Sequence, residues 1–191
     1  MMGIKDFVNG LSSISKWYGG AIVLIYALLS AEYMSTINDF VMKGLGEVSG
    51  IVESLMQLGY IISIISALAA WVIMSLMFHI IALLFNGRQD FSKFLFVSSY
   101  LYFIPAIALV VAINMLGYLD VEESENVINN LMDNRRFILI MDIVNYSYLP
   151  FYLLTVCVIR YSYNIKWLYS FLSVVIPVAS VWGVTELFKL L

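Results

Sequence analysis

The feature that most constrains the fold is a series of long apolar stretches, which fill most of the 191-residue chain. A helix needs roughly 20 consecutive, mostly apolar residues to cross the hydrocarbon core of a bilayer. Five segments meet this requirement, at residues 17–37, 58–85, 94–119, 137–159 and 167–185. We therefore predict an all-α, polytopic transmembrane helix bundle with five transmembrane helices, in which residues 1–191 form a single integral membrane domain.

Composition supports a membrane location. Hydrophobic residues make up 62% of the chain and charged residues 12%, whereas soluble domains carry roughly 45–50% and 25%. So much apolar surface requires the lipid bilayer as its solvent. The net charge is −3, and no run of basic residues suggests a nucleic acid partner or recruitment by anionic lipid.

The connections between the predicted spans are of two kinds. Residues 86–90 and 163–166 form short turns, so the spans that they join are expected to be antiparallel neighbours. Residues 38–57 and 121–136 are longer and place apolar residues at near-helical spacing. We expect short amphipathic helices on the membrane surface in these two outer loops. The alternative is that these helices only cap the bundle.

The distribution of basic residues predicts the orientation, because cytoplasmic loops are enriched in lysine and arginine. A cytoplasmic N-terminus places 6 of the 10 basic residues inside. The inside group is Lys5, Lys16, Arg88, Lys93, Arg160 and Lys166, and the outside group is Lys43, Arg135, Arg136 and Lys189. We therefore predict a multi-pass protein of the plasma membrane with its N-terminus cytoplasmic and its C-terminus outside.

All three prolines, Pro105, Pro150 and Pro177, lie inside predicted spans. Each removes a backbone donor, so the carbonyl four residues earlier needs a partner from a neighbouring helix or from water. Three kinks at similar depth would frame a midplane cavity or a hinge, and the alternative is static kinks that improve packing. The polar side chains that would reach such a cavity are Asn114, Tyr146, Ser147 and Ser173.

Small residues four positions apart let helices approach closely in a membrane. Such pairs are Ser63/Ala67, Ser66/Ala70 and Ala108/Ala112. Two interpretations stay open for them, namely close packing inside the bundle and the seam of a homodimer.

Ionisable residues at membrane depth are costly and raise the hypothesis of a functional site. Here they are Glu32, His79 and Asp142, with Glu186 near the C-terminal end. They would serve either structural pairing or a proton or ion pathway. A third interpretation is an intramembrane enzyme that uses His79 with Glu32 or Asp142.

Motifs for catalysis and for cofactor binding are missing from the sequence. The single histidine rules out an HExxH site, and neither a GxxxxGK[ST] loop nor a GxSxG elbow occurs. The single cysteine, Cys157, lies in an apolar stretch and is expected to be a buried structural thiol. We therefore predict a protein that is not an enzyme, with no catalytic residue, no metal and no cofactor.

The stretch from Trp71 to about Leu109 contains a histidine-bearing span, a glycine turn with a basic residue, and a span with tyrosine and proline. The residues concerned are His79, Asn86, Gly87, Arg88, Phe91, Tyr100 and Pro105. This pattern resembles the Yip1 domain family in its bacterial and archaeal form. The resemblance implies five spans, a cytoplasmic N-terminus and no catalysis. The long N-terminal cytosolic region of eukaryotic members is missing here, which argues against a role in vesicle traffic.

Two functional hypotheses follow. The first is a membrane scaffold or accessory protein that binds another membrane protein, and the resemblance suggests a component of an ABC transporter as that partner. The second is a small transporter, channel or lipid-handling protein with a midplane cavity near the three prolines. The partners expected from the sequence are the lipid bilayer, a membrane protein and, as an alternative, a second copy of the chain.

Overall fold

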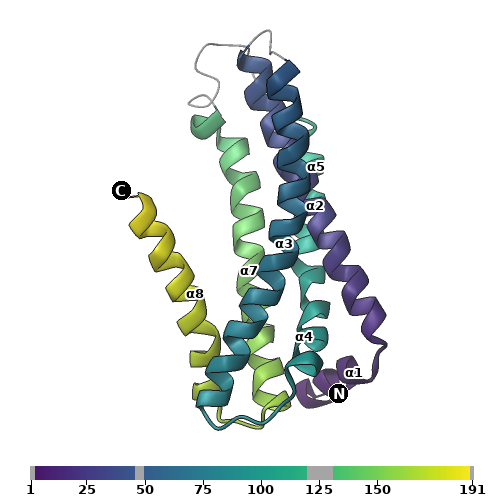
Figure 1. The fold of residues 1–191 in the computed structure, drawn as a ribbon, viewed down its shortest axis with the longest axis vertical. Coiled ribbons are helices and arrows are strands. Elements are labelled where there is room, and N and C mark those ends of the chain that lie inside the picture. The colour runs from purple at the N-terminus through teal and green to yellow at the C-terminus, as the bar shows by residue number, and fades with distance from the viewer. Residues whose placement is uncertain (1–2, 46–49, 120–130, 190–191) are drawn as a thin grey trace. The chain divides into compact units, whose positions relative to one another are not determined.

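The computed structural model describes residues 3–45, 50–119 and 131–189, and every regular element in these ranges is helical (Figure 1). The helices are α1 (Ile4–Ser13), α2 (Lys16–Leu45), α3 (Gly50–Leu84), α4 (Phe91–Ser99), the 3₁₀ helix η1 (Tyr100–Tyr102), α5 (Phe103–Leu116), α7 (Arg135–Ser162) and α8 (Trp167–Lys189). With α4, η1 and α5 counted as one span, five helices are long and apolar enough to cross a membrane. The prediction of an all-α protein with five candidate spans is confirmed.

The helices divide between two compact units. The first unit consists of Met1–Ile22, Ala70–Leu101 and Pro150–Leu191, and the second consists of Val23–Ala69 and Tyr102–Leu149. The first unit therefore contains α1, α4, α8 and both short connections, while the second contains α5 and most of α2.

Helix continuity differs among the proline-bearing spans. The third span changes from α-helix to 3₁₀ at Tyr100–Tyr102, and Pro105 follows in the first turn of α5. Proline cannot donate to the carbonyl of Leu101, which explains the break at this point. Pro150 and Pro177 instead lie inside helices that continue past them, in α7 and α8.

The expected surface helix over residues 38–57 differs from the structure. Residues 38–45 continue α2, and residues 50–57 already belong to α3, so the described part of this segment lengthens two helices. Uninterrupted helical hydrogen bonding favours such extension over a separate short helix. The second expected surface helix, over residues 121–136, falls largely on residues 120–130, which lie outside the described residues.

A short N-terminal helix that the sequence analysis did not anticipate packs beside α4 in the first unit. Val8 of α1 is 2% exposed, and α1 contacts α4. The hydroxyl of Tyr100 donates a hydrogen bond of 2.6 Å to the carbonyl of Ser15, which lies between α1 and α2. These contacts fix the path of the chain from α1 into the first span.

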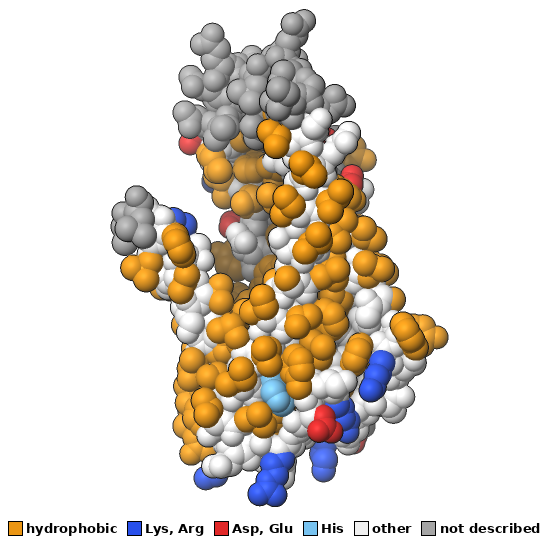
Figure 2. Space-filling model, viewed as in Figure 1, with side chains coloured by type: hydrophobic (Ala, Val, Ile, Leu, Met, Phe, Trp, Pro, Cys, Tyr) orange, Lys and Arg blue, Asp and Glu red, His pale blue; other side chains and the backbone are white. Residues whose placement is uncertain are grey.

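Apolar side chains cover the outer faces of the spans (Figure 2). In α3, Ile61, Ile65 and Ile73 are all exposed. An apolar outer surface is expected of helices that face lipid, because lipid tails are as apolar as these side chains.

Candidate functional site

The first unit contains a buried hydrogen bond between His79 of α3 and Tyr163, the residue that follows α7. Nδ1 of His79 and the hydroxyl oxygen of Tyr163 lie 2.5 Å apart, and the two residues are 8% and 2% exposed. Burial raises the pKa of the Tyr163 phenol, so the hydroxyl keeps its proton. Because a protonated phenol can donate or accept, the direction of this hydrogen bond follows from the tautomer of His79.

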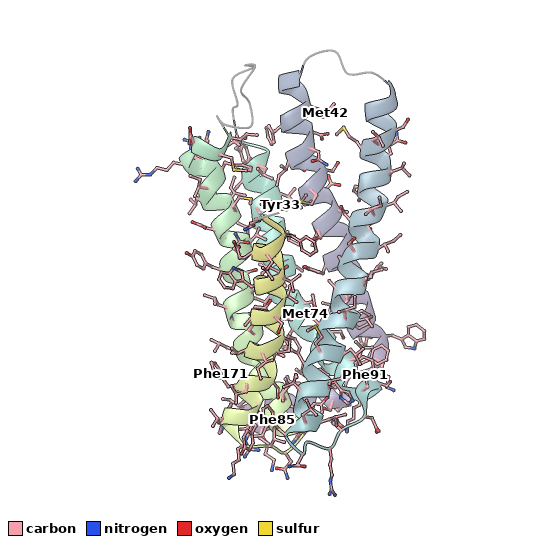
Figure 3. All side chains as sticks on the ribbon, turned by 60° about the vertical axis from the view of Figure 1, so that its left-hand side comes forward. Tyr33, Met42, Met74, Phe85, Phe91 and Phe171 are labelled. Carbon is pink, nitrogen blue, oxygen red and sulfur yellow. The ribbon has the colours of Figure 1, made fainter. Side chains whose placement is uncertain are left out.

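Aromatic rings surround this hydrogen bond. The ring of Phe91 lies 5.3 Å from His79, and the ring of Phe94 lies 5.4 Å from Tyr163. Nearby, Phe85, the residue after α3, stacks on Tyr169 of α8 with the ring centroids 4.8 Å apart. Figure 3 shows Phe85 and Phe91 at the two ends of the α3–α4 connection. The cluster joins the α3–α4 connection to the α7–α8 connection. Its chemistry is that of a packed structural core.

Two asparagines end the helices that carry this pair. Asn86 after α3 and Asn164 after α7 have φ angles of 61° and 55°, in the left-handed region that asparagine tolerates better than most residues. After Asn86, the backbone N–H of Gly87 donates to the carbonyl of Ala82 at 3.0 Å. A Cβ on Gly87 would lie 2.9 Å from the Tyr163 ring. Glycine is therefore required where the two connections meet.

The other candidate ionisable residues lie elsewhere. Glu32 is exposed on α2 and Asp142 is half-buried on α7, and both belong to the second unit. Glu186 pairs with Lys189 at 2.8 Å. Among the described residues, the hydrogen-bond partner of His79 is Tyr163. No three histidine, cysteine, aspartate or glutamate side chains in the described ranges are grouped so that they could hold a metal ion.

Glu32 lies on the outward face of α2. Ile25, Leu28 and Asp39 are exposed at helical spacing from it, so all four side chains share one stripe. Glu32 follows Trp17 by 15 residues (32 − 17), which is about 22 Å along the axis at about 1.5 Å per residue. The hydrocarbon core is roughly 30 Å thick. The carboxylate of Glu32 makes no hydrogen bond or ion pair with a residue that the structure describes.

The prolines and their expected polar neighbours do not share one environment. Pro105 and Pro177 are buried, whereas Pro150 is exposed, and Pro105 belongs to a different unit from the other two. Three of the four polar side chains expected at a midplane cavity bond to carbonyls of their own helices, and Tyr146 is exposed. The bonded side chains are Asn114, Ser147 and Ser173. The midplane cavity stays a prediction.

The small-residue pairs also differ in their surroundings. Ala108 and Ala112 are buried in α5. In α3, Ser63 and Ala67 are half-buried, while Ser66 and Ala70 are exposed. The pair in α5 therefore contributes to internal packing, and Ser66 and Ala70 leave a small-residue step on the outer surface of α3.

The second unit contains a tyrosine cluster that the sequence analysis missed. The hydroxyls of Tyr26 and Tyr148 lie 2.6 Å apart, and the Tyr102 ring packs edge-on against Tyr26 at 4.9 Å. Tyr33 donates to the sulfur of Met141 at 3.1 Å. Tyr26 and Tyr33 are seven residues apart, so they share a helix face well inside a span. Tyrosine usually lies at the membrane interface, so two tyrosines on one face inside a span could have indicated this cluster from the sequence.

We expect Tyr148→Phe to lower the free energy of unfolding by about 0.6 kcal/mol, the average for hydrogen bonds between membrane helices. The reason is the loss of the hydrogen bond to Tyr26. Unfolding by SDS in mixed micelles measures the change. The matched control is Tyr146→Phe, because the Tyr146 side chain is exposed on the same helix. Equal destabilisation by both variants would contradict the role given to the tyrosine pair.

Comparisons with protein-family models, curated proteins and solved structures give no match to this chain. The resemblance to the Yip1 domain family therefore stays a prediction, and function is inferred from the geometry above.

Proposed function

We propose that the chain is a non-enzymatic membrane accessory protein that binds another membrane protein. The observation that supports this proposal is the exposed carboxylate of Glu32 on α2, which lies at membrane depth without a polar partner among the described residues. The adjoining side chains of Ile25 and Leu28 provide an apolar surface along the same stripe.

Electrostatics explain why such a residue favours a protein partner. An acidic side chain at the centre of a membrane helix costs about 2.5–3.5 kcal/mol on insertion scales, and Glu32, which lies between the centre and the outer edge of the core, costs part of this. A neighbouring helix that offers a hydrogen-bond donor or a cationic group to Glu32 would offset part of this cost. The partner is therefore expected to present a polar or basic residue within an apolar span.

The finer features of the proposal concern location, orientation and partner. Six basic residues, Lys5, Lys16, Arg88, Lys93, Arg160 and Lys166, lie in or beside α1, the start of α2 and the two short connections. This grouping supports a plasma membrane protein in which these segments are cytoplasmic, and five spans put the C-terminus outside. A surface helix within residues 121–136 belongs to the same proposal. If the resemblance to the Yip1 domain family holds, a component of an ABC transporter is the expected partner.

The test is purification of the tagged chain from its native membrane in mild detergent, with mass spectrometry of the proteins that accompany it. We expect a stoichiometric membrane partner with the unaltered chain and a large loss of that partner with Glu32→Leu. Asp39→Leu is the matched control, because Asp39 lies two turns further along the same stripe and outside the hydrocarbon core.

Two results would contradict the proposal. One is equal recovery of the partner with Glu32→Leu and with the unaltered chain. The other is a homogeneous chain that carries only bound lipid, which would favour the hypothesis of a transporter or lipid-handling protein.

A further inference from the structure

We propose that α1 is an interfacial helix whose exposed apolar edge binds an anionic phospholipid leaflet. This surface belongs to the first unit and is independent of Glu32, so it goes beyond the binding of a membrane-protein partner.

The sequence of α1 is amphipathic. At about 100° per residue, its apolar side chains fall within an arc of about 100°. These side chains are Ile4, Phe7, Val8 and Leu11. The opposite arc is polar and consists of Lys5, Asp6, Asn9, Ser12 and Ser13. A helix with one narrow apolar face suits a boundary between water and an apolar phase.

Only one edge of the apolar face is used inside the protein. Val8 is buried and α1 contacts α4, whereas Phe7 at the other edge is 41% exposed and Ile4 is also exposed. Figure 1 shows α1 lying beside the lower end of α4 in that view. α1 is therefore fixed on one side by protein and leaves apolar side chains uncovered on the other.

The depth of α1 indicates what covers these side chains. Its C-terminal end is held at Ser15 by Tyr100. Tyr100 follows the first residue of α4 by nine positions (100 − 91), or about 13 Å along a helix. The junction of α1 and α2 thus lies beside a spanning segment and not beyond its end. Trp17, at this junction, is 88% exposed, and tryptophan favours the headgroup level of a bilayer.

Charge favours an anionic leaflet. The first unit contains seven basic residues, which are scattered along the sequence, and three acidic residues, Asp6, Asp90 and Glu186. Glu186 pairs with Lys189, so six basic residues and two acidic residues of this unit remain outside that ion pair. Figure 2 shows lysine and arginine side chains gathered at one end of the visible face. Lys16 also lies over the Phe96 ring at 5.6 Å, which places its ammonium group near the α1 junction. Basic groups at this level attract anionic headgroups.

The decisive experiment places a single spin label on each face of α1. Cys157, the only cysteine, is removed by the substitution Cys157→Ser. A new cysteine, from Phe7→Cys or from Asn9→Cys, then carries the label. The full chain is purified alone and reconstituted into phosphatidylcholine vesicles with or without phosphatidylglycerol. The accessibility of each label to oxygen and to a water-soluble nickel chelate is measured.

We expect the label at residue 7 to be several-fold more accessible to oxygen than to the nickel chelate, and the label at residue 9 to show the reverse. Phosphatidylglycerol should deepen the label at residue 7, and Lys5→Gln should remove most of that shift. Nickel access at both positions would overturn the proposal, since α1 would then lie in water. Exclusion of both reagents from residue 7 would also overturn it and indicate a second copy of the chain. A depth that does not respond to phosphatidylglycerol would overturn the assignment to an anionic leaflet.

Discussion

Replacement of Tyr163 by alanine is expected to lower the free energy of unfolding by about 3–5 kcal/mol, the range for buried large aromatic residues. Tyr163 is fully buried, packs against the ring of Phe94, and hydrogen-bonds His79. Its removal leaves a cavity between two connections and a buried imidazole nitrogen without its hydrogen-bond partner. Unfolding by SDS in mixed micelles, followed by circular dichroism, measures the change.

Two further variants separate packing from hydrogen bonding. Tyr163→Phe keeps the ring and loses only the hydroxyl, so we expect a loss of about 0.6–1.7 kcal/mol. Tyr118→Ala removes a tyrosine that is almost fully exposed and should change stability little. If Tyr163→Ala were no more destabilising than Tyr118→Ala, the His79–Tyr163 cluster would not hold the first unit together.

The five spans could be predicted because their signal is local. Length and apolar content decide whether a helix can cross a bilayer, and neither depends on what the helix contacts. Pro105 likewise predicted a disturbance of the third span, and η1 lies just before it. These features need only the order of residues along one segment.

The helix α1 and the extended ends of α2 and α3 were harder to predict. α1 has ten residues, and a helix this short is marginal in water without a surface to pack on. Its position depends on residues more than 80 positions away, such as Tyr100, whose hydroxyl donates a hydrogen bond to the carbonyl of Ser15 just after α1. Apolar residues in 38–57 suit a surface helix and the end of a span equally well, so spacing alone could not separate the two.

The partner of His79 was predicted wrongly, as Glu32 or Asp142, because the sequence places ionisable residues but not their contacts. His79 was expected because an ionisable group inside a span is rare, but its partner Tyr163 is 84 positions further along the chain. Tyr26 and Tyr148 are separated by 122 positions. Aromatic hydroxyls near the ends of spans are common for interfacial reasons, so nothing in the sequence distinguished Tyr163 from the other tyrosines.

At Gly87, a turn that was predicted correctly from local sequence also has a tertiary cause, so substitution there should strongly affect stability. The Asn86–Gly87 pair predicted a turn, but the structure adds that the glycine faces the carbonyl of Ala82 and the ring of Tyr163. A Cβ at Gly87 would lie 2.7 Å from that carbonyl and 2.9 Å from Cδ1 of that ring. One obstacle is backbone and the other is a fully buried ring, so neither can move cheaply.

We expect Gly87→Ala to lower the free energy of unfolding by about 1–3 kcal/mol, the usual cost of overpacking. Gly183→Ala in α8 is the matched control, because a Cβ there meets nothing within 4 Å. A helix with alanine in its interior is more stable than one with glycine by about 0.5–1 kcal/mol, so Gly183→Ala should stabilise the protein. In SDS unfolding the two substitutions should therefore shift the midpoint in opposite directions. A stabilising Gly87→Ala would show that the α3–α4 connection does not close on Tyr163. In the double variant Gly87→Ala/Tyr163→Ala, the ring that obstructs the new methyl group is gone. Gly87→Ala should therefore cost less stability in that background than in the unaltered chain.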